Sequence, residues 1–369
     1  MICVPKYRFD EIAINSTEKK KPVEADKDTY IGLEHLDSGC LEVTRWGADV
    51  APIGDKLVMR KGDVLFGRRR AYQKKVAIAP FDGIFSAHGM VLRPMESVIS
   101  KEFFPFFISS DYFLDAAIKI SVGSLSPTIN WRDLAKLEFE IPTLDEQEAI
   151  SGILWAMNRL KVAYTTLLQQ ADALVQSQFV EMFGERFATC RIKLEQIASS
   201  TIGLTYKPEN TSDSEGTIVL RSGNIQDGEL NIKDDIVRVA GIVIPDNKYV
   251  YPGDILMCSR NGSASLVGKC CRIPECEEAM AFGAFMTVIR SQYPSFLYGF
   301  FQSQYFKEQL TNVGTTSINQ ITTKMLNAYE TVMPTVEEEN RFSLLLRETD
   351  KSKYCLQRAQ VSQMKTARR

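Results

Sequence analysis

Short apolar runs separated by Gly, Pro and Asp fill the chain up to Pro142. Runs of this length and composition are typical of β-strands joined by tight turns. Two longer aromatic-rich stretches, residues 101–119 and 295–310, each begin beside a proline and are predicted to be helices. A mixed α+β globule is therefore expected before Pro142. The predicted strands are residues 43–46, 56–59, 63–66, 75–79 and 89–92.

After Pro142 the apolar residues recur at every third or fourth position, which is the spacing of a coiled-coil helix. A helix over residues 143–182 would be roughly 60 Å long. A weaker apolar seam runs from Thr335 towards the end of the chain. We predict that the two helices pack antiparallel and separate two globular units; the alternative is that each packs on its own unit. The apolar positions are Ile150, Ile153, Leu154, Met157, Leu160, Tyr164, Leu167, Leu168, Ala171, Leu174 and Val175, then Phe342, Leu345, Leu346, Thr349, Leu356 and Ala359.

Both long helices are predicted to begin with the same capping device. Thr143 is followed three residues later by Glu146, and Thr335 by Glu338. In such a capping box the hydroxyl and the carboxylate each accept a hydrogen bond from a backbone N–H that the helix leaves free. A proline stands before each threonine and ends the preceding strand.

The two halves of the chain repeat each other at an offset of roughly 190 residues, which indicates a duplicated domain with its connector. The clearest matches join 61–66 to 252–257 and 141–146 to 333–338, and shorter ones join 122–124 and 129–130 to 313–315 and 318–319. The sequence thus predicts two tandem-repeated α+β domains and two long helices, with pseudo-twofold symmetry. The expected bounds are 1–142 and 185–334 for the domains and 143–184 and 335–369 for the helical spacers.

Composition and charge describe an ordinary globular protein. Of 369 residues 44% are hydrophobic and 24% are charged, which suits about two domains. The formal charge is −2, from 44 basic and 46 acidic residues, so any site for a polyanion must be a local patch. No apolar stretch reaches the roughly 18–20 residues that span a bilayer. No secretory leader opens the chain, so a cytoplasmic location with reduced cysteines is expected.

Motifs for catalysis or cofactor binding are missing from the sequence. The two histidines, His35 and His88, are isolated, and neither a nucleophile elbow nor a glycine-rich nucleotide loop is present. We therefore expect no catalytic residue and no S-adenosylmethionine or ATP bound by this chain. Four cysteines cluster without the paired spacing of zinc ligands, so we expect small buried side chains on strands and no metal. They are Cys258, Cys270, Cys271 and Cys276.

Basic and amide-rich loops follow the matched strands in both halves. Arg and Lys pair with the acceptor edge of guanine, Asn and Gln with adenine, and Ser with phosphates, so these residue types can read duplex DNA. The alternative is a solvated surface with plain turns, the loops 121–130 and 315–319 included. The candidate DNA-binding residues are Arg68, Arg69, Arg70, Gln73, Lys74 and Lys75, then Ser259, Arg260, Asn261, Ser263 and Lys269.

The arrangement resembles the DNA-specificity subunit of type I restriction-modification enzymes over essentially the whole chain. The resemblance rests on the segments 129–130 (IN), 141–147 (IPTLDEQ) and 176–184 (QSQFVEMFG). It implies two target recognition domains, each binding one half of a split sequence in double-stranded DNA, and helices that fix the gap. It also implies two methyltransferase subunits that use S-adenosylmethionine and restriction subunits that use ATP and Mg. The specificity subunit itself carries no active site in this family.

The resemblance carries over to individual residues only at the helix starts, which are expected to contact partner subunits. In the second copy Glu339 stands where the family usually has glutamine. Two other interpretations stay open: a stand-alone DNA-modifying enzyme with unrecognised motifs, and a tandem-domain adaptor that binds other proteins. The matching residues are Pro142, Glu146 and Gln147 in the first copy and Pro334 and Glu338 in the second, and the capping residues Thr143 and Thr335 are expected among the same contacts.

Overall fold

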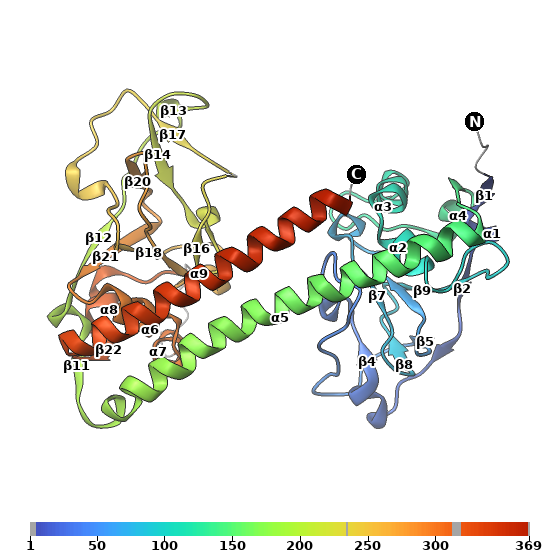
Figure 1. Ribbon diagram of the computed structural model, residues 1–369, viewed down its shortest axis with the longest axis horizontal. Helices are drawn as coiled ribbons and strands as arrows, with labels where there is room; N and C mark the ends of the chain where they lie inside the picture. Colours follow the sequence, from blue (N-terminus) through green and yellow to red (C-terminus); the bar gives the residue numbers. More distant parts are fainter. Residues whose placement is uncertain (1–4, 234, 312–318, 368–369) are drawn as a thin grey trace. The chain divides into compact units, whose positions relative to one another are not determined.

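The computed structural model describes residues 5–233, 235–311 and 319–367, which fall into two compact units, Met1–Leu160 and Lys161–Arg369 (Figure 1). Helix α5 (Leu144–Thr189) is continuous across the boundary between the units. The repeat segment 313–315 and most of the predicted loop 315–319 lie outside the described residues. Within the described ranges, none of the helices has the length and hydropathy that a bilayer-spanning segment requires.

Unit 1 contains two four-stranded sheets and a two-stranded ladder. The first sheet has the order β2-β9-β6-β7 and is antiparallel throughout. The second has the order β3-β5-β8-β4, in which β4 and β8 run parallel, and β10 pairs with β1. The elements are β1 (Lys6–Arg8), α1 (Phe9–Ile12), β2 (Ala13–Ser16), β3 (Lys19–Lys20), β4 (Tyr30–Ile31), β5 (Lys56–Met59), β6 (Val64–Phe66), β7 (Val76–Ile78), β8 (Gly83–Phe85), β9 (Met90–Pro94), α2 (Phe104–Ser109), α3 (Asp111–Lys119), α4 (Trp131–Leu134) and β10 (Glu138–Glu140).

Unit 2 repeats this plan, so the predicted tandem α+β architecture is confirmed. Its sheet β12-β21-β18-β19 corresponds to β2-β9-β6-β7, its ladder β11-β22 to β1-β10, and its parallel pair β14 and β20 to β4 and β8. Strands β17 and β13 extend the second sheet, and β15 and β16 form a hairpin. The elements are β11 (Arg191–Lys193), β12 (Ala198–Ile202), β13 (Thr211–Ser212), β14 (Thr217–Leu220), β15 (Ile225–Gln226), β16 (Glu229–Leu230), β17 (Arg238–Val239), β18 (Ile255–Cys258), β19 (Cys270–Arg272), β20 (Met280–Phe282), β21 (Met286–Ser291), α6 (Pro294–Gln302), α7 (Gln304–Thr311), α8 (Thr323–Ala328), β22 (Glu330–Val332) and α9 (Val336–Ala367).

The two predicted aromatic helices are each split in two, so the prediction of continuous helices was wrong. Helices α2 and α3 meet at Ser110, and α6 and α7 meet at Ser303, both with extended backbone. The two hydroxyls donate hydrogen bonds of 2.6 Å to the carbonyls of Phe107 and Phe300. Ser110 also accepts from the Phe113 N–H and caps α3. These side-chain bonds compete with continuation of the helix.

The predicted strand at 43–46 does not form either. This segment has no ladder partner within the described ranges. Val43 is nevertheless buried, and the Trp46 ring lies 5.2 Å from the Phe81 ring. The apolar pattern there reflects packing against the core, which needs no strand pairing. The other four predicted strands form, as β5, β6, β7 and β9.

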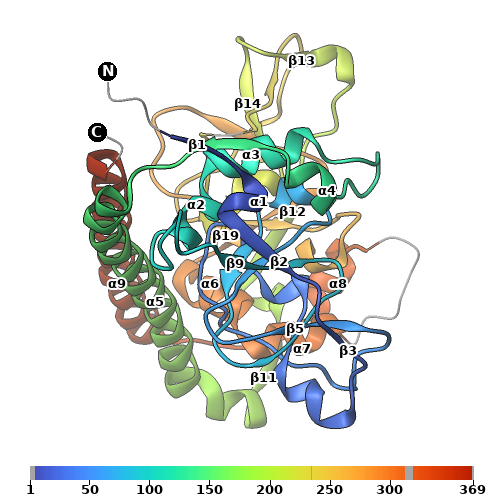
Figure 2. The same ribbon diagram turned by 90° about the vertical axis from the view of Figure 1, so that its right-hand side faces the viewer.

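Within unit 2, α5 and α9 lie side by side and antiparallel, as predicted (Figures 1 and 2). Asp172 of α5 pairs with Lys353 of α9 at 2.6 Å, and Arg186 pairs with Glu338 at 2.7 Å. From the first pair to the second, the residue number rises along α5 and falls along α9, so the two helices run in opposite directions. Helix α9 also packs on α6 of the same unit, because Glu339 accepts hydrogen bonds from the Ser295 and Phe296 N–H groups, so both packing alternatives hold in part.

The predicted apolar seam of α5 is only partly correct, because some of its residues face outward. Val175 is buried, whereas Leu167 and Leu174 are 46% and 50% exposed. Residues seven apart stay on one face of a helix with little drift, so these two leucines share an outer face. The buried face of α5 in unit 2 is formed by aromatic residues that follow Val175, namely Phe179, Phe183 and Phe187.

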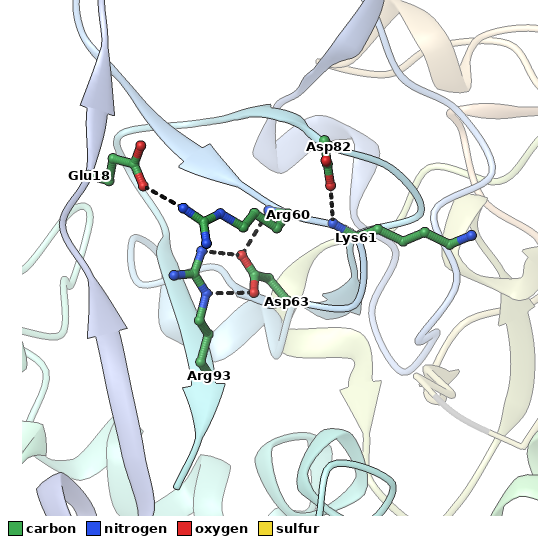
Figure 3. A network of polar contacts seen from close by, with 6 residues as sticks. All are labelled: Glu18, Arg60, Lys61, Asp63, Asp82 and Arg93. Carbon is green, nitrogen blue, oxygen red and sulfur yellow. Dashed lines mark hydrogen bonds and ion pairs between the residues drawn. The ribbon is translucent and has the colours of Figure 1, made fainter. Parts of the chain in front are cut away.

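The Gly-Asp dipeptide shared by the two halves places a buried carboxylate beside an arginine. Asp63 accepts two hydrogen bonds from the Arg93 guanidinium, at 2.7 and 2.8 Å, and a third from the Arg60 N–H at 2.8 Å (Figure 3). In unit 2, Asp254 binds Arg290 in the same way, at 2.9 Å. The Asp63 and Asp254 side chains are only 8% and 7% exposed. The matched motif therefore ties the start of β6 to β9, and the start of β18 to β21.

Close packing around Gly299 of α6 gives a first prediction. A Cβ atom there would lie 2.5 Å from Phe179 and 2.7 Å from Phe342. Gly299→Ala should therefore overpack unit 2 and lower its free energy of unfolding by about 1–3 kcal/mol. Circular dichroism during denaturation should show an earlier unit-2 transition. Tryptophan fluorescence should not change, because the tryptophans, Trp46, Trp131 and Trp155, all lie in unit 1.

The matched control is Gly152→Ala in α5, where an added Cβ would meet no atom within 4 Å. Alanine has the higher helix propensity, so this variant should unfold no earlier than the parent chain. Equal destabilisation by both substitutions would contradict the packing described around α6.

Candidate nucleic-acid interface

The candidate loops of each unit meet at the carboxyl ends of the strands. The parallel pairs β4/β8 and β14/β20 send their following loops out on one side of the sheet. The loop after β6 joins that side in unit 1, because the Arg69 N–H donates to the His88 carbonyl at 3.2 Å. In unit 2 the Arg260 N–H donates to the Phe285 carbonyl at 3.1 Å. Arg69 and Arg260 therefore occupy equivalent positions.

A second backbone contact supports this equivalence and corrects the sequence match. Arg69 forms an isolated bridge with Thr128, and Arg260 forms one with Gln320. The residues that follow, Ile129 and Ile321, are both buried. The Ile-Asn segment at 129–130 therefore corresponds to residues 321–322, and the predicted match with 318–319 was displaced by three positions.

In unit 1, Arg69 and Arg70 are exposed, whereas Arg68 is half-buried. The Arg70 Nε lies 3.5 Å from the Ser126 Oγ, and the Arg69 Nη1 lies 3.4 Å from the His88 Nε2. Burial, and then the charges of Arg69 and Arg68, lower the pKa of His88, so its ring is neutral near pH 7. A neutral imidazole can accept from Arg69 and orient its guanidinium.

The other candidates of this loop have partners inside unit 1. Lys74 forms ion pairs with Asp111 at 2.7 Å and Asp115 at 2.8 Å, and these hydrogen bonds raise the pKa of Lys74. The Lys75 ammonium donates to the Leu33 carbonyl at 2.6 Å. Gln73 is half-buried in a short turn of 3₁₀ helix. The structure thus directs Arg69 and Arg70 outward and uses the lysines to hold the loop.

In unit 2 the guanidinium of Arg260 is held on two sides. Its Nε and Nη2 donate to the Gln320 Oε1 at 3.0 and 2.6 Å, and its centre lies 5.7 Å from the Phe285 ring. Asn261 donates to the Ser222 hydroxyl at 3.2 Å. Among the other candidates, Ser259 is buried, Ser263 is exposed and Lys269 is half-buried.

Four residues at this edge were missed by the sequence analysis. His88 was interpreted as isolated, yet it faces Arg69. Ser126, Phe285 and Gln320 contact the candidate arginines from segments distant in sequence. The signal that the sequence offered was the position of these four residues, which lie directly after a matched strand or between matched strand and helix segments. Local periodicity cannot reveal that these residues contact the arginines, because strand pairing between distant segments brings them together.

At the helix starts both capping boxes are present. The Thr143 and Thr335 N–H groups donate to Glu146 and Glu338 at 2.9 and 2.8 Å. The return bonds, from the glutamate N–H groups to the threonine hydroxyls, measure 3.4 and 3.2 Å. Pro142 and Pro334 stand between the final strand of each repeat and these boxes.

The residue after each capping glutamate ties the long helix to its own unit. Gln147 is fully buried; its amide accepts from the Ser100 N–H at 2.7 Å and donates to the Val98 and Pro142 carbonyls. Glu339, which departs from the family pattern, accepts from two N–H groups in the first turn of α6, both at 2.8 Å. A carboxylate suits that position because helix N-termini attract negative charge.

The clustered cysteines do not form a metal site in the structure. Within the described ranges no group of three or more His, Cys, Asp or Glu side chains is placed to hold a metal ion. Cys258, Cys270 and Cys271 are buried on strands, as predicted, but Cys276 is exposed, so the prediction was wrong there. Burial raises the pKa of all three buried thiols, that of Cys271 to about 12.

Thiol labelling checks this arrangement. In the native protein a maleimide at neutral pH should modify the exposed Cys190, Cys276 and Cys355. The three buried thiols should react only after denaturation, because they are both inaccessible and protonated. Peptide mass spectrometry would report the sites, and rapid native labelling of Cys271 would contradict the description of β19.

Part of the chain is similar to a known protein family. Residues 14–171 match the type I restriction modification DNA specificity domain. This part of the chain is similar to that family. The matched segment includes the Arg69 edge and the beginning of α5.

Relatives of the specificity domain carry the same description. The chain is 28% identical over 149 residues to the type I restriction enzyme EcoDI specificity subunit of Escherichia coli, covering 39% of this chain and 32% of the relative. It is 27% identical over 165 residues to the StySPI specificity subunit of Salmonella potsdam, covering 41% and 35%. The chain thus matches about a third of the length of these curated relatives.

A solved structure shows that the fold similarity extends over both units. The crystal structure of the type I restriction-modification system S subunit from M. genitalium superposes with a TM-score of 0.52 at 14% identity. It covers 97% of this chain, and the match spans 92% of that chain. At this identity the comparison concerns the fold alone.

Proposed function

We infer that this chain is the DNA sequence-specificity subunit of a type I restriction-modification complex and recognises a bipartite DNA target. One observation carries the proposal: each repeated unit presents an arginine, Arg69 or Arg260, at the same strand edge. The surroundings of the two arginines differ. Arg69 lies beside His88, and Arg260 lies between Gln320 and Phe285. The two units share the same backbone arrangement at this edge but carry different side chains there, which suits recognition of two half-sites of different sequence.

The chemistry of this edge is that of base reading. An arginine donates two hydrogen bonds to guanine O6 and N7, and an asparagine such as Asn261 can pair with adenine. The net charge of −2 leaves little electrostatic attraction for the DNA backbone. We therefore assign most phosphate contacts to partner subunits.

The proposed partners are two methyltransferase subunits that use S-adenosylmethionine, and restriction subunits that use ATP and Mg. The chain itself is proposed to be non-catalytic and to bind none of these cofactors. The exposed helix starts with Thr143, Glu146 and Thr335 are proposed to contact the methyltransferase subunits. Gln147, also expected as a contact, is buried in its own unit like Glu339, so neither is proposed as one. Helix α5 is proposed to set the gap between half-sites. The proposed location is the cytoplasm.

The test is to map methylated adenines by direct DNA sequencing after expression of this chain with a methyltransferase subunit. The full chain should direct methylation to a two-part motif. A variant without residues 1–142 should lose one specified half or all methylation. A methylation pattern that does not depend on this chain, with the complex shown to form, would reject the proposal in favour of an adaptor. Methylation by the purified chain alone would favour an enzyme.

A further inference from the structure

A cavity of about 530 Å³ opens beside the Arg260 edge of unit 2. Phe285 lines it and also packs against the Arg260 guanidinium. Ser222 lines it as well and accepts the hydrogen bond from Asn261. The cavity and the proposed base-reading loop therefore share two wall residues. Its volume lies within the range of about 300–1,000 Å³ that is typical of small-ligand sites.

The walls of the cavity combine aromatic, apolar and paired charged groups. Phe285 is 59% exposed, so its ring is available for stacking, and Tyr206 contributes a second ring. The polar part is the ion pair between Arg221 and Asp235, whose Nη2 and Oδ1 atoms are 2.5 Å apart. The Arg221 Nε is buried and has no hydrogen-bond partner within the described ranges. Leu204 and Met286 complete the apolar part.

These features select a class of ligand. Because the carboxylate of Asp235 is neutralised by Arg221, the cavity suits a neutral group better than a phosphate. A nucleobase is neutral and flat and offers hydrogen-bond donors and acceptors along one edge, which suit a carboxylate and a guanidinium. Proteins hold unstacked bases with this combination of aromatic stacking and edge hydrogen bonds. The neighbouring Arg260 is placed to meet the DNA to which such a base is attached.

We propose that the cavity of unit 2 receives an unstacked nucleobase from the half-site that this unit reads. This inference rests on the proposed function. It adds that unit 2 selects one position by the fit of an extrahelical base between Phe285 and the Arg221–Asp235 pair. The other positions are read by Arg260 and Asn261 within the duplex.

The experiment uses the complex of this chain with its methyltransferase subunit and duplexes that carry the mapped motif. One base at a time is replaced by a fluorescent analogue whose emission rises when it unstacks. Emission should rise several-fold at one position of the unit-2 half-site, at a base other than the methylated adenine. Ala284→Trp, which places an indole in the cavity, should abolish that rise. Phe285→Ala should weaken DNA binding about tenfold.

The matched control is Val243→Trp, because Val243 is 94% exposed in unit 2 and does not line the cavity. This variant should keep both the emission change and the methylation motif. Denaturation curves for Ala284→Trp, Phe285→Ala and Val243→Trp show whether unit 2 is folded in each variant. If Ala284→Trp prevents folding, Leu204→Phe fills the cavity from its apolar side and should have the same effect.

Several results would overturn the inference. One is a duplex in which no base except the methylated adenine unstacks, and another is an emission rise that Ala284→Trp leaves intact. A third is binding of free deoxynucleoside monophosphates, blocked by Ala284→Trp, while every base of the duplex stays stacked; the cavity would then be a site for free nucleotides. Absence of any two-part motif would instead refute the proposed function. A motif without cavity-dependent unstacking would refute this inference alone.

Discussion

Arg260→Ala is expected to relax one half of the methylated motif and leave the other half unchanged, and Arg69→Ala should do the reverse. Each arginine lies at the proposed reading edge of its own unit, so its loss should remove contacts with one half-site only. A bidentate arginine–guanine pair contributes about 1–3 kcal/mol of discrimination. That corresponds to a roughly 5- to 150-fold lower methylation rate for the parent sequence. Sequencing of methylated DNA reports the motif, and single-turnover methylation reports the rate.

A control for simple loss of charge is Arg132→Ala in unit 1. The Arg132 side chain is 85% exposed, and its ion-pair partner is the adjacent Asp133, at 3.7 Å. Removing this cation should leave the motif intact. Gln320→Ala is a second informative variant, because it frees the guanidinium of Arg260 without removing it. Gln320→Ala should lower the methylation rate by less than Arg260→Ala does, and it should relax the same half of the motif. Relaxation of both halves by one arginine substitution would contradict two independent reading edges.

Asp63→Ala should lower the free energy of unfolding of unit 1 by about 3 kcal/mol. The substitution leaves the Arg93 guanidinium and the Arg60 N–H without their partner in a nearly buried position. Breaking a buried ion pair on one side costs about 3–5 kcal/mol. The lower end applies because Arg93 keeps 28% side-chain exposure and regains some hydration. Denaturation followed by tryptophan fluorescence isolates unit 1, since unit 2 contains no tryptophan.

The same polar network supplies the control, since Figure 3 also shows Glu18 beside Arg60. That pair is exposed, at 3.5 Å, so Glu18→Ala should change stability by less than about 1 kcal/mol. The double variant Asp63→Ala/Arg93→Ala should be more stable than Asp63→Ala alone, because no charge is then left without its partner. Equal effects of Glu18→Ala and Asp63→Ala would show that the buried pair does not stabilise unit 1.

Much of the candidate site lies where sequence reasoning could not place it. The candidates Arg69, Arg70 and Arg260 were found because they follow strands that match between the halves. Their neighbours were not found, because His88 and Phe285 reach them only through the antiparallel pairing of β6 with β9 and of β18 with β21. Lys74 and Lys75 are residue types that a DNA-binding loop often contains. In unit 1, however, Lys74 forms ion pairs with two carboxylates, and Lys75 donates to a backbone carbonyl. Composition reports which groups are present and not what they bind.

The sequence by itself determined the features that depend on neighbours three or four residues apart. The capping boxes at Thr143 and Thr335 and the helical period after them arise from backbone and side-chain contacts within one or two turns. The duplication was visible too, because identical local constraints recur in both copies. Only the tertiary structure decided which residues share the proposed reading edge, which aromatic face of α5 is buried and where Ser110 and Ser303 interrupt helices. Those outcomes depend on strand register and on packing between segments that are distant in sequence. A local sequence pattern carries no information about the energies of such contacts.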